Sequence, residues 1–101
     1  MVKHIVMFKF LPSAEGRSKD ENVRLTAEKL KALQGKIPEL ISSEVIIGAD
    51  AQSESNYDLI LIADYKNFDD LNAYIVHPLH KAVGEFMKNL RESRACIDYE
   101  Y

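Results

Sequence analysis

Two of the three histidines of this chain flank a proline in the segment Tyr74-Ile75-Val76-His77-Pro78-Leu79-His80. Histidine titrates near neutral pH and is therefore a common general acid or base. If Pro78 begins a helix, His80 lies in its first turn, where the positive end of the helix dipole lowers the pKa of an imidazole. An imidazole that is neutral at pH 7 meets the first requirement of a general base.

Tyr74 and His4 are the side chains that could join His80 in one site. Tyr74 could donate a hydrogen bond to a carbonyl oxygen as that oxygen becomes an enolate. His4 lies in an apolar run that alternates like a strand, and it could border the same cavity. These residue types predict proton abstraction beside a carbonyl, followed by cyclisation or isomerisation without a cofactor. We therefore take His80 and Tyr74 as candidate catalytic residues and His4 as a candidate substrate-binding residue.

Each of these residues also has a purely structural interpretation. His77 can cap the helix that follows it, and His80 can hydrogen-bond to a carbonyl group at the corner. Tyr74 can be a large core residue with a wet hydroxyl, and His4 a hydrogen-bonded residue of a half-buried strand. A protein that binds a small apolar ligand, or no ligand, is therefore the alternative to a cyclase, lyase or isomerase.

The periodicity of the apolar residues predicts the elements that would position these side chains. Alternating or continuous apolar runs indicate strands over residues 2–10, 41–49, 57–65 and 94–101. A capping box over residues 18–21 begins a helix that an apolar stripe extends to about Gln34. Asn67 begins a short second helix, which ends near residues 74–76, and Pro78 begins a third.

This order of elements predicts an α+β fold, namely a ferredoxin-like sandwich with a four-stranded antiparallel sheet and helices on one face. We expect residues 1–101 to form a single domain. The strands 2–10 and 57–65 carry apolar side chains on both faces, so the uncovered face would be an exposed apolar patch. A second copy packed against that face would cover it, and we therefore predict a homodimer.

Composition argues against several other classes of protein. The net charge is -3 and the basic residues are not clustered, which argues against nucleic-acid binding. No apolar run approaches the ~20 residues of a membrane span, and the first residues lack the layout of a signal peptide. The single cysteine, Cys96, cannot form an internal disulfide and fits a cytoplasmic location. We predict neither a cofactor nor a metal site.

Several segments carry a resemblance to a known family: Val2-Lys3-His4-Ile5-Val6, Tyr57, the segment 74–80 and Ile97-Asp98-Tyr99. In this order and spacing they resemble the stress-responsive dimeric α/β-barrel family, often called Dabb. The resemblance spans essentially the whole chain. It implies the ferredoxin-like fold, a dimer whose two sheets close into a barrel, and a stress-responsive protein of uncertain activity.

The resemblance also implies roles for single residues. Olivetolic acid cyclase, a plant member, closes a linear polyketide with a tyrosine and a histidine that match Tyr74 and His80. A histidine on its first strand matches His4, and the resemblance thus implies a small apolar or polyketide-like ligand. Another histidine, on its third strand, has no counterpart, because Asp58 and Leu59 stand there.

Two further comparisons with the family bear on cofactors and on activity. Some plant members hold magnesium near the end of the first helix, but residues 33–39 here contain no carboxylate cluster with ligand spacing. The related antibiotic-biosynthesis monooxygenases share the dimeric barrel, and they remain a further alternative for the activity of this chain.

Overall fold

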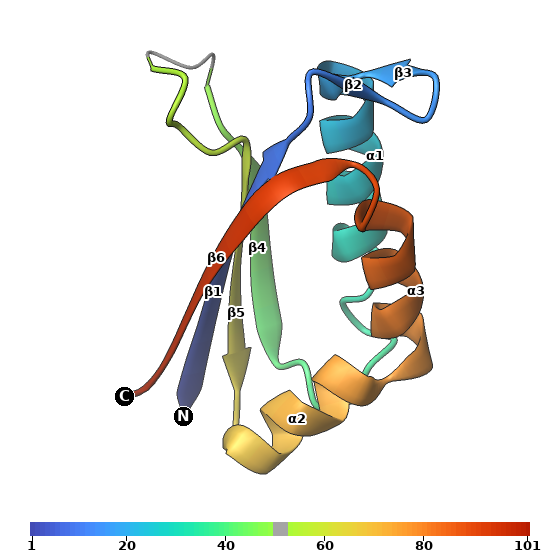
Figure 1. The fold of residues 1–101 in the computed structure, drawn as a ribbon. Coiled ribbons are helices and arrows are strands. Elements are labelled where there is room, and N and C mark those ends of the chain that lie inside the picture. The colour runs from blue at the N-terminus through green and yellow to red at the C-terminus, as the bar shows by residue number, and fades with distance from the viewer. Residues whose placement is uncertain (50–52) are drawn as a thin grey trace.

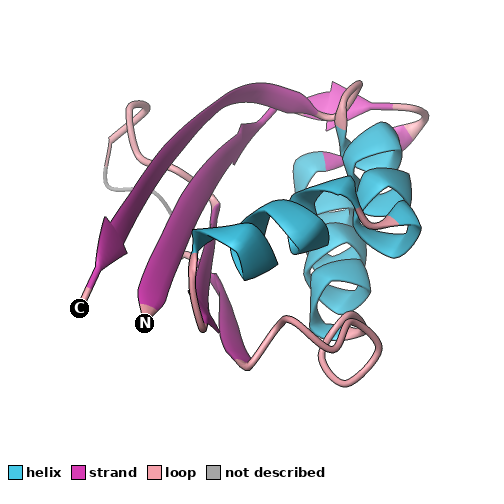
Figure 2. Ribbon diagram, turned by 90° about the horizontal axis from the view of Figure 1, so that it is seen from below, coloured by secondary structure: helices cyan, strands magenta, loops and turns pink. Residues whose placement is uncertain are grey.

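The computed structural model describes residues 1–49 and 53–101 as a sheet with all three helices on one of its faces (Figures 1 and 2). The sheet has the order β4-β5-β1-β6, and every neighbouring pair is antiparallel. Its strands are β1 (Val2–Phe10), β4 (Ser42–Ile47), β5 (Leu59–Tyr65) and β6 (Arg91–Glu100), and the helices are α1 (Lys19–Lys31), α2 (Phe68–Val76) and α3 (Pro78–Met87). The predicted ferredoxin-like fold is therefore confirmed.

The helix starts lie where the sequence predicts them, because their caps are local. Ser18 Oγ accepts a hydrogen bond from the Glu21 amide at 3.3 Å and donates one to the Glu21 carboxylate at 3.3 Å. Asn67 caps α2 by accepting from the Asp70 amide at 2.9 Å. None of the described helices is long and apolar enough to cross a membrane.

The corner between α2 and α3 also matches the prediction. His77 is extended, with a ψ of 135°, and its Nδ1 accepts a hydrogen bond from the Leu79 amide at 3.1 Å. Pro78 occupies the first helical position, where its missing N–H costs nothing. His77 is therefore a helix cap, and His80 is left as the titratable group in the first turn of α3.

Several elements differ from the sequence prediction. The two middle strands are shorter, with β4 over Ser42–Ile47 instead of 41–49 and β5 over Leu59–Tyr65 instead of 57–65. The helix α1 ends at Lys31 rather than near Gln34, and turns follow, in which Gly35 has a φ of +86°. A small hairpin of β2 (Ser13–Ala14) and β3 (Arg17–Ser18) precedes α1 and was not predicted. The last strand begins at Arg91 rather than Arg94, because residues 91–93 continue the pairing with β1. The connection predicted over residues 48–56 lies partly outside the described residues.

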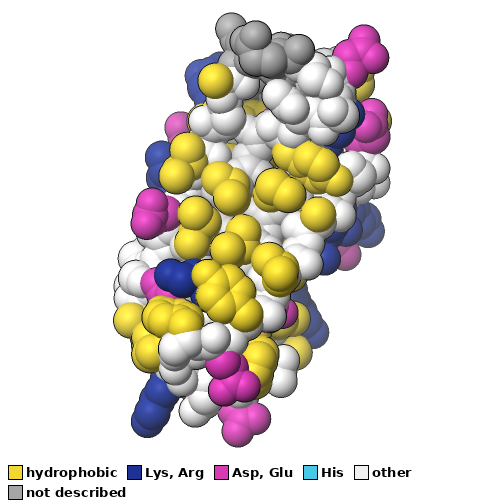
Figure 3. All heavy atoms as spheres, turned by 90° about the vertical axis from the view of Figure 1, so that its left-hand side faces the viewer, with side chains coloured by type: hydrophobic (Ala, Val, Ile, Leu, Met, Phe, Trp, Pro, Cys, Tyr) yellow, Lys and Arg dark blue, Asp and Glu magenta, His cyan; other side chains and the backbone are white. Residues whose placement is uncertain are grey.

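The two faces of the sheet differ in how they are covered. The even-numbered residues of β1 and the odd-numbered residues of β5 pack under the helices and are buried. The opposite face carries Ile5, Met7, Ile60 and Ile62, with no helix over them, and Figure 3 shows hydrophobic side chains gathered there. We call this second surface the open face.

Candidate functional site

A cavity of about 400 Å³ lies between the helix side of β1 and β6 and the helix α3. Its floor and roof are apolar and include Val6, Phe8, Val83 and Met87. Its polar lining residues are His4, His80, Arg91, Arg94 and Cys96. We call this cavity the groove.

The groove exists because β6 is an edge strand that the helices do not cover. The helix-side residues of β1 are buried, whereas Arg94, Cys96 and Asp98 on the same side of β6 are exposed. Its alternation with Ile97 and Tyr99 in the sequence predicts that Asp98 lies on the outer face of this strand, and that prediction is wrong. Asp98 is paired with His4 in the register of the two strands, so both side chains lie on the helix side.

His80 is half-buried in the groove wall, and its tautomer follows from its hydrogen bond. Its Nδ1 lies 3.0 Å from the carbonyl oxygen of Ile75. A carbonyl oxygen can only accept, so Nδ1 carries the proton and the neutral ring keeps its lone pair on Nε2. A general base needs such a lone pair, and the backbone of α2 holds the ring that carries it.

The pKa of His80 is lowered, as the sequence predicts, but burial is the largest cause. The hydrogen bond to Ile75 opposes the shift because it favours the charged ring. The positive charge of Arg94 lowers the pKa further. The imidazole is therefore neutral at pH 7.

Tyr74 lies behind His80 and is not among the residues that line the groove. It is 1% exposed, and its ring centroid lies 4.5 Å from that of His80 and 5.2 Å from that of Tyr65. Burial raises the pKa of Tyr74 to about 12. In this structure Tyr74 supports the imidazole instead of facing a ligand.

Tyr65 completes a row of four rings that joins the two histidines of the groove. Its ring meets His4 edge to face at 6.3 Å on one side and packs on Tyr74 on the other. Its hydroxyl is fully buried and has no hydrogen-bond partner within the described part of the chain. We did not single out Tyr65 from the sequence, because a tyrosine that ends a strand carries no distinctive spacing.

His4 forms a hydrogen-bonded pair with Asp98 through Nδ1 and Oδ1. It is 5% exposed, yet it reaches the groove wall as predicted. The sulfur of Cys96 lies 3.6 Å from the same Nδ1 and 3.8 Å from Asp98 Oδ1. Because Cys96 and Asp98 share one nitrogen of His4, the three residues do not form a relay of the cysteine-protease kind, which uses both ring nitrogens.

The same three residues are the group, among those described, that could hold a metal ion, since their ligand atoms lie within 4.8 Å of one another. A metal would have to replace the hydrogen bond between His4 and Asp98 and to deprotonate Cys96. Burial and the Asp98 carboxylate raise the pKa of that thiol, and Arg94 adds a positive charge beside it. Without a metal the thiol of Cys96 therefore stays protonated.

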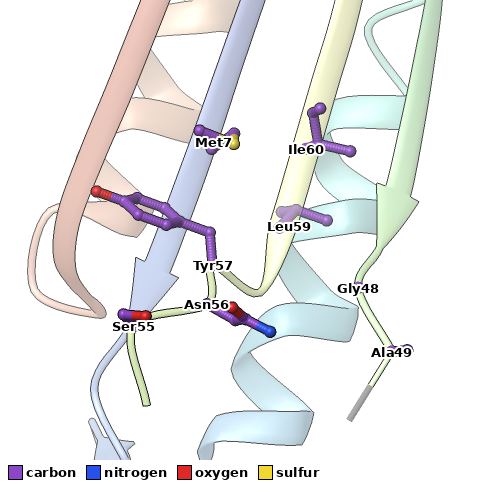
Figure 4. A pocket seen from close by; sticks show the side chains of 8 residues that line it. All are labelled: Met7, Gly48, Ala49, Ser55, Asn56, Tyr57, Leu59 and Ile60. Carbon is purple, nitrogen blue, oxygen red and sulfur yellow. The ribbon is translucent and has the colours of Figure 1, made fainter. Parts of the chain in front are cut away.

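A second hollow of about 490 Å³ lies on the open face at the far end of β1 and β5 (Figure 4). Its lining includes Met7, Ile60 and Tyr57, together with Gly48 and Ala49 beside the undescribed residues. It contains no histidine, acid or basic side chain. The groove is therefore the place where two of the three candidate residues, His4 and His80, meet.

The profile of the family described as Stress responsive A/B Barrel Domain (Dabb) matches residues 2–101. The chain belongs to this family. The Dabb chain is also similar to the stress-response A/B barrel domain-containing protein DABB1 of Arabidopsis thaliana, with 25% identity over 107 residues and 98% of this chain covered. It spans about half of that relative, 46% of its length.

Solved structures support the same fold for the Dabb chain. A dimeric protein of unknown function with a ferredoxin-like fold from Bacteroides fragilis is 33% identical, with a TM-score of 0.87, over 99% of this chain and 95% of that one. The hydroxynitrile lyase of Passiflora edulis is 12% identical, with a TM-score of 0.78, over 97% of this chain and 90% of that one. At that identity the lyase shows a likeness of fold alone.

Proposed function

We propose that this Dabb protein binds a small carbonyl compound in the groove and that His80 abstracts a proton beside the carbonyl without a cofactor. One observation carries the proposal: the half-buried imidazole of His80 at the groove wall donates its Nδ1 proton to the Ile75 carbonyl, which leaves Nε2 as a base. His4, which Asp98 holds in place, is the proposed contact for a polar group of the ligand.

The proposed reaction needs only proton transfers. Nε2 of His80 takes a proton from the carbon next to the carbonyl, and the electron pair of that bond moves to the oxygen as an enolate. The enolate then attacks a second carbonyl or reprotonates at another position, and His80 returns the proton to the product. The apolar floor of Val6 and Phe8 excludes water and strengthens each electrostatic contact.

We propose only part of the polyketide-cyclase mechanism for this chain. The family resemblance matches His80 to the cyclase histidine, and we assign Tyr74 the role of holding its ring, because the two ring centroids lie 4.5 Å apart. Asp58, which replaces a further histidine of the cyclase, accepts a hydrogen bond from the Phe10 amide at 2.8 Å and pairs with Lys19 at 3.6 Å. Since Asp58 is engaged in the scaffold, we infer a substrate class of small dicarbonyl compounds in place of long polyketides.

We also propose that the protein is a homodimer joined through the open face and that it works in the cytoplasm. The similar Bacteroides fragilis protein is dimeric, and the open face of this chain carries exposed apolar side chains such as Ile46, Ile97 and Tyr99. Burial of such a surface is the driving force of most protein dimers. The single cysteine supports the cytoplasmic location. No feature of the groove favours a monooxygenase over proton transfer.

The test follows the exchange of the protons between the two carbonyls of β-diketones with D₂O, recorded by proton NMR. We expect His80→Ala to lower the catalysed exchange about 10²- to 10⁴-fold, the range typical of general bases. His77→Asn is the matched control, because asparagine is also a good helix cap, and it should keep the exchange rate. Binding of the diketone without faster exchange in the wild-type protein would instead favour a ligand-binding protein without catalysis.

A further inference from the structure

We propose that Arg91 and Arg94 form an anion-binding end of the groove, which takes the carboxylate of an otherwise apolar acid. The inference deepens the proposed function, since it concerns the ligand of the same groove. It rests on three observations: the register of β6, the distribution of charge around the groove, and the apolar surface next to the two arginines.

A β-bulge places both arginines on the helix side of the sheet. Residues three apart on a regular strand point to opposite faces. Here Arg94 pairs with Phe8, whereas Arg91 pairs with Phe10, and the register shifts between Lys9 and Phe10. The extra residue of β6 therefore turns Arg91 to the same side as Arg94, and both side chains line the groove.

The bulge also keeps negative charge out of the groove. Glu92 stands between the two arginines in the sequence, but its carboxylate lies 3.4 Å from the Nζ atom of Lys9, which belongs to the other face. Asp98 is engaged by His4. Among residues 1–49 and 53–101, neither arginine lies within 4.0 Å of a carboxylate, and no acidic side chain lines the groove.

Two guanidinium groups without a carboxylate partner, beside an apolar floor, suit one class of ligand. Arginine binds carboxylates through two parallel hydrogen bonds, and such pairs are stronger away from bulk water. Val6, Phe8 and Met87 offer the adjoining surface to an apolar chain or ring. Arg94 and Asp98 are four residues apart on β6, about 13 Å along an extended strand, so a ligand held by the arginines extends toward the histidine end of the groove.

The test compares an acid with a neutral analogue of the same shape, 4-phenylbutanoate and 4-phenylbutanamide, by titration calorimetry. We expect the wild-type protein to bind the acid at least about tenfold more tightly, which corresponds to roughly 1.4 kcal/mol. The double variant Arg91→Gln/Arg94→Gln should lose this preference and keep its affinity for the amide. The preference should also weaken as salt is raised.

A matched control is Arg24→Gln, which removes one positive charge from the exposed side of α1. It should leave the preference for the acid unchanged, and circular dichroism should show the same fold for all variants. Equal binding of the acid and the amide by the wild-type protein, or a preference that survives the double substitution, would overturn the proposal.

The failure of this proposal and the failure of the proposed function are distinguishable. If His80→Ala leaves proton exchange in neutral diketones unchanged while the acid preference depends on the arginines, the anion-binding end stands and the catalytic role falls. If exchange depends on His80 and the acid shows no preference, the catalytic role stands and the anion-binding end falls.

Discussion

The two faces of the sheet differ in how they combine polar and apolar side chains. On the helix side, titratable groups such as His4, His80 and Arg94 are set into an apolar cavity. On the open face, isoleucines dominate, and the main polar group is a network around Asp64 near one end of the sheet. The comparison shows that one sheet can carry a polar groove on one face and an apolar surface on the other. Successive side chains of a strand point to opposite faces, which keeps the two sets of residues apart.

The network on the open face is a fixed structure, whereas the polar groups of the groove are partly unpaired. Asp64 accepts hydrogen bonds from Lys3 at 2.7 Å, from Ser42 at 2.7 Å and from Tyr101. In the groove, Nε2 of His80 has no assigned hydrogen-bond partner and neither arginine has a carboxylate partner within the described residues. Unpaired polar groups beside an apolar cavity are typical of a ligand site, and satisfied ones are typical of a scaffold.

The largest expected effect comes from placing a charge on the open face. Ile62 lies at the centre of this face, opposite Ile5 in the register. Ile62→Asp would bury two like charges in a dimer, and we expect the dissociation constant to rise at least about 100-fold. Sedimentation velocity at micromolar concentration measures the change. Lys31→Gln, with the same change in charge on the exposed side of α1, should leave the dimer intact; a dimer that tolerates Ile62→Asp contradicts the proposed interface.

A second substitution tests whether ligand binding in the groove can be weakened without loss of stability. Gly84 lines the groove on α3, and an added Cβ there would meet no atom within 4 Å. We expect Gly84→Phe to fill the groove and to weaken ligand binding by at least about tenfold, without loss of stability, because a helical glycine is a poor helix former. Titration with a groove ligand and thermal unfolding together measure this. Unchanged binding would show that the ligand lies elsewhere.

Alanine substitutions at Gly84 and Gly35 provide a control, because we expect them to change the stability in opposite directions. Gly84→Ala should stabilise the protein by up to about 1 kcal/mol, since alanine favours the helix. Gly35→Ala should destabilise it by about 1 kcal/mol, because the φ of +86° at Gly35 is strained for alanine.

The pH dependence of proton exchange tests the electrostatics of the groove. The folded-state pKa of His80 is lowered from 6.5. Activity that needs the neutral base should therefore be retained as the pH falls through 6.5 and be lost only as it passes the lower, folded-state pKa. Arg94→Gln removes a nearby positive charge and should shift this acidic limb upward. A limb that does not move in the variant would show that Arg94 does not act on the base.

The same pKa shift predicts how His80 contributes to stability. Because the unfolded chain binds the proton first, the contribution of His80 is complete above pH 6.5 and declines below it until the folded-state pKa is reached. His80→Ala should remove this part of the pH dependence of the free energy of unfolding.

The smallest effect is expected on the open face, at Asp64. Burial opposes its ionisation, but hydrogen bonds from Lys3, Tyr101 and Ser42 hold the pKa of Asp64 at about 2, below the ordinary 3.8. Its stabilising contribution is therefore present above about pH 4 and declines as the pH falls toward 2. We expect Asp64→Asn to lower the free energy of unfolding by about 1 kcal/mol at pH 7 and to flatten its pH dependence in this window. Urea titrations from pH 2 to pH 7 measure both.

Features encoded by short stretches of sequence were predictable. The strands, the caps at Ser18 and Asn67, and the corner at Pro78 depend on residues only a few positions apart. The assignment of His77 to the cap and of His80 to the first turn follows from that corner. The hairpin before α1 was missed because its two strands have two residues each, too few to show alternation.

The last strand shows where prediction from sequence stops. Alternation separates Ile97 and Tyr99 from Cys96 and Asp98, but it does not say which set faces the helices. From this alternation we expected Asp98 on the outer face. The register with β1 places the apolar set on the open face, because the helices leave the other side of this edge strand uncovered.

By itself, the sequence determined the fold, the helix corner and the three residues His4, Tyr74 and His80 as candidates for a site, since local periodicity and caps encode them. Only the tertiary structure decided that Tyr74 stands behind the groove and that Asp98 holds His4. It also decided that a bulge turns Arg91 toward the groove. The physical reason is the same in each case: strand register and the cover over each face arise from contacts between residues far apart in the chain, and no short stretch of sequence contains them.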